Sequence, residues 1–127
     1  MDVSTYLQIY IDYVVLIVWH RYFLKAIDWA RKYGLRINLD LHALPGSQNG
    51  WNHSGRLGTI GVLNGPMGYA NAQRALDYIR ILAEFISQPQ YKDVVAIFGI
   101  MNEPLGTLMG QDQLSRLYAF ISPLVHT

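Results

Sequence analysis

Residues 35–42, LRINLDLH, alternate strictly between apolar and polar side chains, and this pattern limits the possible folds more than any other feature. The apolar set runs at every second position from Leu35 to Leu41, and the polar set includes Asp40 and His42. A period of two is typical of a β-strand, because successive side chains point to opposite faces. The segment therefore predicts a strand with one apolar face and one polar face that ends in histidine.

Segments with helical spacing flank this strand. Residues 20–33 place Phe23, Ile27 and Ala30 on one face, and Gly34 follows where a left-handed C-terminal cap is expected. A second amphipathic helix is predicted over residues 71–87, and a third helix from about residue 112. Residues 94–101, VVAIFGIM, are continuously apolar, which is typical of a parallel strand that is buried on both faces.

The predicted order of helix, strand, helix, strand and helix is that of a parallel α/β fold. In this class, functional side chains gather at the carboxyl ends of the strands. The first strand ends in Asp40 and His42, and Asn102 and Glu103 follow the second strand. We therefore expect these four residues at one edge of the sheet.

Each of these residues has a functional and a structural interpretation. Glu103, set against an apolar strand end, could act as a general acid whose protonated form is favoured by desolvation, or it could cap the next segment. Asn102 could hydrogen-bond a substrate hydroxyl. His42 could contact a sugar hydroxyl or orient a carboxylate, or it could be a hydrogen-bonded structural residue. Asp40 shares the face of His42 but lies deeper, which favours a structural role.

The connection between residues 43 and 68 is rich in glycine, asparagine and proline and is much longer than a usual loop. Ordered loops of this length are often functional. Trp51 within it could pack into a core or offer a stacking platform for a sugar ring. Residues 52–54, Asn-His-Ser, also match a glycosylation sequon, a pattern of low specificity.

Composition argues against several classes of function. The chain carries 10 basic and 9 acidic residues without a basic run, so neither nucleic acid nor an anionic membrane surface is an expected partner. It contains no cysteine, which excludes disulfides and thiolate metal sites. The apolar run over residues 13–19 is shorter than the roughly 20 residues of a membrane span and is expected to be a buried strand or a helix start. We predict no signal peptide, because the first residues lack a basic region and a cleavage site.

Two motifs together resemble one enzyme family. DLHALPGSQNGWNHSGRLG at residues 40–58 and GIMNEPLG at residues 99–106 are similar to the fungal exo-β-1,3-glucanases of glycoside hydrolase family 5, and the resemblance extends over about residues 20–117. It implies an α/β fold of the (β/α)8 TIM barrel type, with this chain carrying about the third and fourth strands. It also implies a retaining β-glycosidase that releases glucose from β-1,3-glucan without metal or cofactor, in the extracellular space or the cell wall.

The resemblance also assigns roles to single residues. Glu103 is the implied acid/base, and Asn102 is implied to contact the hydroxyl beside the anomeric carbon. His42 is implied to line the subsite of the terminal glucose, and Trp51 to supply the aromatic side chain at the cleft entrance. His53 stands where a substrate-binding asparagine is common in the family.

The chain departs from the family pattern at both ends. Residues 1–19 form an atypical N-terminal segment, where the family has two earlier strands, and residues 20–127 correspond to a partial barrel domain. Retaining hydrolysis needs two carboxyl groups about 5–5.5 Å apart, and Asp40, the one other carboxylate expected on the lumen side, lies too deep to attack. We therefore expect a fragment that lacks the nucleophile and is inactive alone. A related endo-β-glycanase, a glucan-binding remnant and a non-functional remnant are the alternatives.

Overall fold

The computed structural model describes residues 6–12 and 16–125. Strands and helices alternate along the chain: β1 (Tyr6–Asp12), α1 (Leu16–Tyr33), β2 (Arg36–Ala43), α2 (Gly68–Ile86) and β3 (Val95–Gly99). A short 3-10 helix, η2 (Asn52–Ser54), lies in the loop after β2, and α3 (Gly106–Met109) and α4 (Gln111–Val125) follow β3. The expected α/β pattern is confirmed, with one additional strand at its start.

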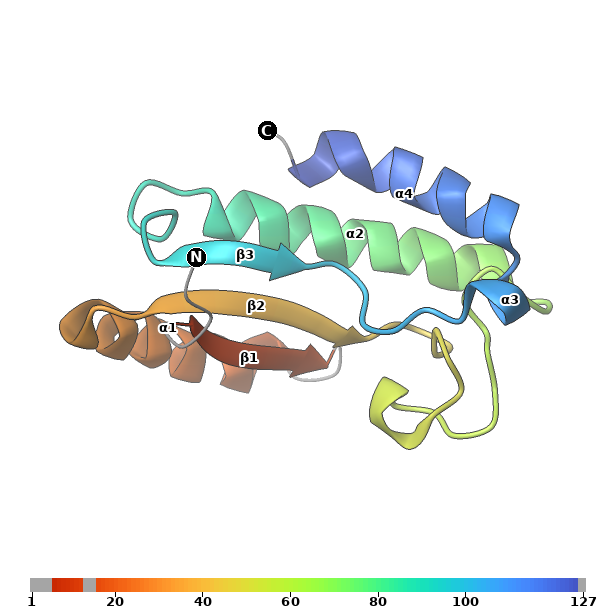
Figure 1. Ribbon diagram of the computed structural model, residues 1–127, viewed down its shortest axis with the longest axis horizontal. Helices are drawn as coiled ribbons and strands as arrows, with labels where there is room; N and C mark the ends of the chain where they lie inside the picture. The colour runs from red at the N-terminus through yellow and green to blue at the C-terminus, as the bar shows by residue number, and fades with distance from the viewer. Residues whose placement is uncertain (1–5, 13–15, 126–127) are drawn as a thin grey trace.

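The described strands form one parallel sheet in the order β1-β2-β3, and their arrowheads point the same way in Figure 1. The helices α2 and α4 run side by side along one side of the sheet in this view, and α1 lies near the opposite end of β2 from η2. Because all strands are parallel, their carboxyl ends meet at one edge, from which the long loop projects.

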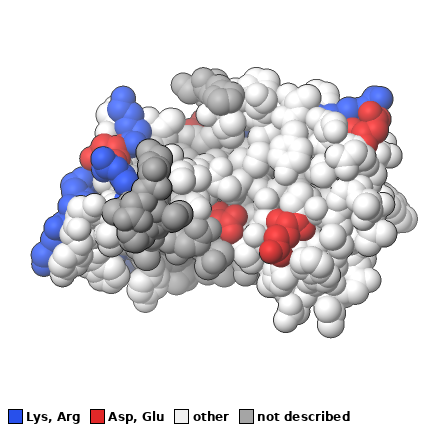
Figure 2. Space-filling view, in the orientation of Figure 1, with Lys and Arg blue, Asp and Glu red and all other residues white. Residues whose placement is uncertain are grey.

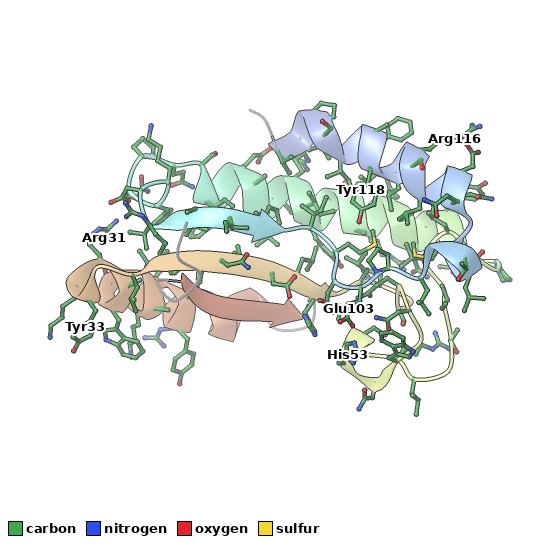
Figure 3. All side chains as sticks on the ribbon, viewed as in Figure 1. Arg31, Tyr33, His53, Glu103, Arg116 and Tyr118 are labelled. Atoms are coloured by element: carbon green, nitrogen blue, oxygen red, sulfur yellow. The ribbon has the colours of Figure 1, made fainter. Side chains whose placement is uncertain are left out.

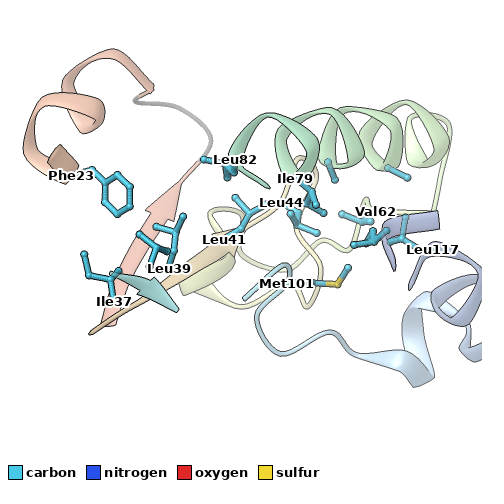
Figure 4. Close-up of a cluster of buried hydrophobic side chains, with 14 of the residues drawn as sticks. Phe23, Ile37, Leu39, Leu41, Leu44, Val62, Ile79, Leu82, Met101 and Leu117 are labelled. Carbon is cyan, nitrogen blue, oxygen red and sulfur yellow. The ribbon is translucent and has the colours of Figure 1, made fainter. Parts of the chain in front are cut away.

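The predicted strand over residues 35–42 is confirmed as β2, with bounds shifted by one residue. Ile37, Leu39 and Leu41 are almost completely buried, whereas the opposite face carries Asn38, Asp40 and His42. The apolar face contacts a core to which α1 contributes Phe23 and Ile27, and α2 contributes Ile79 and Leu82 (Figure 4). The alternation thus separates a core face from a polar face, as the period of two requires.

The C-terminus of α1 follows the sequence prediction. Gly34 has a φ of 69°, and the Leu35 amide donates a hydrogen bond to the Ala30 carbonyl at 2.8 Å. This is the geometry of a glycine-terminated helix, in which the left-handed residue turns the chain back onto the last carbonyls. The cap directs the chain from α1 straight into β2.

Three predictions about the secondary structure require correction. The first helix begins at Leu16 and not at residue 20, and Tyr6–Asp12 is a strand paired with β2. Residues 13–15 lie outside the described residues. The apolar strand at 94–101 is shorter than predicted and is not buried on both faces, since Ala96 and Ile97 are exposed. The reason is its place at the edge of the described sheet, where it has one neighbour.

The amino ends of the strands are tied by a polar contact. Arg31 of α1 donates to the carbonyl of Gln90 at 2.7 Å and to the carboxylate of Asp93 at 3.1 Å. This hydrogen bond holds the pKa of Asp93 below its ordinary value. Figure 3 places Arg31 far from Glu103, at the other end of the molecule. Asp93 therefore lies away from the predicted site, as expected.

Candidate active site

The predicted site residues meet at the carboxyl edge of the sheet. β2 and β3 are adjacent and parallel, and His42 and Asn102 approach each other there, with 3.5 Å between Nε2 and Nδ2. Figure 3 shows Glu103 and His53 together at this end of the strands. The predicted juxtaposition of His42 with Asn102 and Glu103 is confirmed, and Trp51 lies beside them through its contact with His53.

Asp40 fixes the orientation of His42. Its Oδ2 lies 2.8 Å from Nδ1 of His42, and the aspartate is only 6% exposed. An ionised carboxylate can only accept, so Nδ1 carries the donated proton, and Nε2 faces the side chain of Asn102. The Asn102 amide group then points its NH2 at His42 and leaves its oxygen for another partner. The structural role expected for Asp40 agrees with this geometry.

A glycine makes room for this aspartate. Gly99 of β3 pairs with Asp40 across the sheet, and a Cβ built on Gly99 would lie 2.8 Å from Oδ1 of Asp40. Real Cβ atoms do not approach an oxygen so closely. Gly99 therefore leaves room for the Asp40 carboxylate beside β3.

Glu103 lies on a left-handed turn, with a φ of 45°, directly after the strand. Few non-glycine residues adopt this conformation, and strained residues of this kind gather at functional sites. Its side chain is 56% exposed, and Oε2 lies 3.0 Å from Nε2 of His53. The expected desolvation by the strand end is therefore wrong for this structure, because the turn lifts the carboxylate out of the sheet edge.

The long loop is folded and brings Trp51 and His53 to Glu103. Ser54 of η2 is buried, its hydroxyl pairs with that of Ser47, and it donates to the carbonyl of Trp51 at 2.7 Å. The His53 ring lies between those of Trp51 and His42, with ring centroids 5.4 and 5.6 Å away. Trp51 remains 43% exposed, so core packing does not explain this side chain, and one part of its ring faces solvent.

Gln48 and Asn49 join the two strand ends, a role that the sequence did not reveal. Gln48 is fully buried; its Nε2 donates to the carbonyls of His42 at 2.8 Å and Asn102 at 2.9 Å. Its Oε1 accepts from the amide of Leu44 at 3.1 Å. Asn49 donates to the carbonyl of Glu103 at 3.2 Å. The sequence shows only two consecutive amide residues inside a loop. Solvent-exposed turns often contain the same residue types, so this pattern did not predict a buried role.

Charged side chains are unevenly distributed over the surface of the molecule (Figure 2). On the face seen in Figure 2, Lys and Arg atoms gather at the two ends, and acidic atoms also lie nearer the middle. Within residues 6–12 and 16–125, no cluster of three or more histidine, cysteine, aspartate or glutamate residues could hold a metal ion. No helix in the same part of the chain is long and apolar enough to cross a membrane. A groove of about 500 Å³ between α2 and α4 is lined by none of the candidate residues.

Comparison with known proteins supports the resemblance that the two motifs suggested. Over 93 residues, or 73% of this chain, it is 60% identical to a protein of Aspergillus flavus named as a probable glucan 1,3-beta-glucosidase D. It is 60% identical to the protein of that name from Aspergillus niger and 56% identical to the one from Aspergillus fumigatus, over the same share of the chain. The resemblance to fungal glucan 1,3-beta-glucosidases is confirmed. The chain spans only 11% of the length of these glucosidase relatives, and no family model matches it.

Solved structures support the fold. The chain matches a rutinosidase from Aspergillus niger with a TM-score of 0.66 at 19% identity, over 96% of this chain and 39% of that one. A second structure, named AoRut, matches with the same TM-score and identity over 41% of its length.

Proposed function

We propose that this chain is part of a glycoside hydrolase that releases glucose from β-1,3-glucan by a retaining mechanism, with Glu103 as the acid/base. The observation that carries this proposal is the exposed Glu103 carboxylate at the carboxyl edge of a parallel sheet, beside His42, Asn102 and the open ring of Trp51. The identity to the glucosidase relatives supports the substrate class, which is a β-glucan outside the cell or in its wall.

The proposed fold of the whole protein is a (β/α)8 barrel in which β2 and β3 are the third and fourth strands. Two features support it. The sheet is parallel with a helix after each strand, and β2 carries apolar residues on its core face and polar ones on the other. In such barrels, active sites lie at the carboxyl ends of the strands. The face with Asp40 and His42 is then the lumen face.

Each of the remaining site residues contacts a different part of the substrate. The Asn102 oxygen, freed by the orientation of its NH2 toward His42, accepts a hydrogen bond from the sugar hydroxyl beside the anomeric carbon. His42 lines the subsite of the terminal glucose. The exposed part of the Trp51 ring stacks on a neighbouring sugar, since apolar sugar faces pack well on aromatic rings. These groups place the glycosidic oxygen near Glu103.

A retaining mechanism requires a second carboxyl group about 5–5.5 Å from the first. Asp40 is the described carboxylate on the polar face of β2, but it is buried and its Oδ2 is bonded to His42. It cannot reach a sugar in the space above the strand ends. We infer that the nucleophile belongs to a strand outside residues 6–125, and that Glu103 first protonates the leaving oxygen and then activates the attacking water.

The test places this segment in a complete enzyme. In the grafted enzyme, the 93 matched residues of this chain replace their counterparts in the Aspergillus flavus relative, which retains the rest of its own chain. We expect it to release glucose from the β-1,3-glucan laminarin and to leave carboxymethyl cellulose intact, with β-glucose as the first anomer in NMR spectra. An α-anomer would contradict the retaining mechanism, activity on cellulose would favour an endo-β-glycanase, and glucan binding without hydrolysis would favour a remnant.

Gln48 offers a test of the loop that supports Glu103. Replacing it with leucine in the grafted enzyme leaves two buried carbonyls and one buried amide without their partner, each at a cost of about 1–3 kcal/mol. We expect Gln48→Leu to lower the free energy of unfolding by more than about 2 kcal/mol in urea titrations, together with the rate on laminarin. Gln73→Leu is the control, because Gln73 is exposed on α2 and its side chain donates to Asp77 at 3.3 Å, one turn away on the same helix. Equal stability of the two variants would contradict the role of Gln48.

A further inference from the structure

The contact between His53 and Glu103 joins two distant parts of the chain. The residues are separated by 50 positions, and 3.0 Å separates Nε2 of the histidine from Oε2 of the glutamate. The side chains are 39% and 56% exposed, respectively. Exposed pairs of this kind contribute little to stability. The contact therefore does little to hold the fold, and its consequence concerns the carboxylate itself.

The His53 ring is held in place without the help of Glu103. The ring contacts those of Trp51 and His42, and the backbone amide of His53 donates to the Asn52 side chain at 2.9 Å. The following residue, Ser54, is buried and bonded to Ser47. His53 thus offers a donor at a position set by the loop.

Glu103, in contrast, has a fixed backbone and a side chain that would turn freely. Asn49 donates to its carbonyl, and the Glu103 backbone has a φ of 45°. More than half of the side chain faces solvent, so packing constrains the carboxylate less than it would in a buried site. The contact with His53 involves Oε2 of the Glu103 carboxylate and not Oε1, so it makes the two oxygens different.

We propose that His53 is a positioning residue that holds Oε2 of Glu103 and so presents Oε1 to the glycosidic oxygen. This rests on the proposed acid/base role of Glu103, and it replaces the substrate contact that the sequence predicted for His53. Nε2–H of His53 donates to Oε2, and the proton of the Glu103 carboxyl group sits on Oε1. When that proton passes to the glycosidic oxygen, the carboxylate that remains keeps the same hydrogen bond to His53. Proton transfer then proceeds from an oxygen whose direction the loop has set, rather than from a freely rotating group.

The kinetic test compares His53→Phe and His53→Gln in the grafted enzyme. Phenylalanine keeps a ring between Trp51 and His42 but has no donor, whereas glutamine restores an N–H at a similar reach. Misplacing a catalytic group by about 1 Å can cost about 100-fold in rate, so we expect His53→Phe to lower kcat on laminarin by about 10–100-fold. Aryl glucosides with good leaving groups need little protonation and should be cleaved in the glycosylation step within about threefold of wild type. His53→Gln should recover most of the laminarin rate.

Two readouts keep this proposal separate from the proposed function. Suppose that Glu103→Gln is inactive on laminarin, and that His53→Phe lowers the rates on laminarin and on aryl glucosides by the same factor. The positioning role of His53 is then wrong, and the acid/base role of Glu103 stands. Crystal structures of the grafted enzyme and its His53→Phe variant give an answer even without turnover. We expect one Glu103 rotamer with His53 and more than one without it, and a single unchanged rotamer in His53→Phe would overturn the proposal.

Discussion

Glu103→Gln in the grafted enzyme is expected to lower the rate of laminarin hydrolysis by about 10²–10⁴-fold, the usual contribution of general acid–base catalysis. Glutamine keeps the size and hydrogen-bonding reach of the side chain but cannot supply a proton. A sugar leaving group departs poorly without protonation, so the rate of the first step, glycosylation, falls by this factor. The substrate should still bind, because His42, Asn102 and Trp51 are unchanged.

The pattern across substrates separates a lost acid from a damaged fold. Glucosides with good leaving groups should react nearly normally in the glycosylation step, and added azide should restore turnover of Glu103→Ala, because azide attacks the glycosyl-enzyme without a general base. Glu84→Gln is the control, since Glu84 is an exposed glutamate of α2 paired with Arg80. Laminarin turnover by Glu103→Gln at the wild-type rate would remove Glu103 from the mechanism.

The 127 residues expressed alone are expected to show no hydrolysis of β-glucan and to self-associate. Hydrolysis fails because one carboxylate cannot form and break a glycosyl-enzyme intermediate. Association follows from the sheet, in which β1 and β3 each have one described neighbour and an open edge. Ile97 on β3 is 45% exposed, and open apolar edges pair readily with other chains.

Light scattering and a glucose assay test this second expectation. Ile97→Lys should reduce association if the β3 edge is the contact, because an edge lysine opposes pairing. Phe120→Lys is the matched control; Phe120 is 68% exposed on α4, away from the sheet edge. Equal effects of the two variants would assign the association to general apolar exposure. A monodisperse monomer that releases glucose from laminarin would contradict both the missing nucleophile and the open edge.

Local patterns were sufficient to predict several elements. The alternation in residues 35–42 predicted β2 and its two faces, and the helical spacing before Gly34 predicted all of α1 except its first turn, together with its cap. The placement of His42 beside Asn102 followed from one general rule, that parallel strands align their carboxyl ends. Other predictions failed where burial depends on neighbours: the apolar run of β3 predicted two covered faces, and the described sheet ends there.

The sequence was sufficient to predict that His42, Asn102 and Glu103 follow neighbouring strands, because strand period, glycine caps and the residues after each strand are local properties of the chain. Only the tertiary structure decided how those residues are arranged. The joining of the strand ends by buried Gln48, the left-handed turn that exposes Glu103, and the approach of His53 across 50 residues are set by long-range hydrogen bonds. Such contacts depend on how the loop packs against both strands, and no local periodicity records that packing.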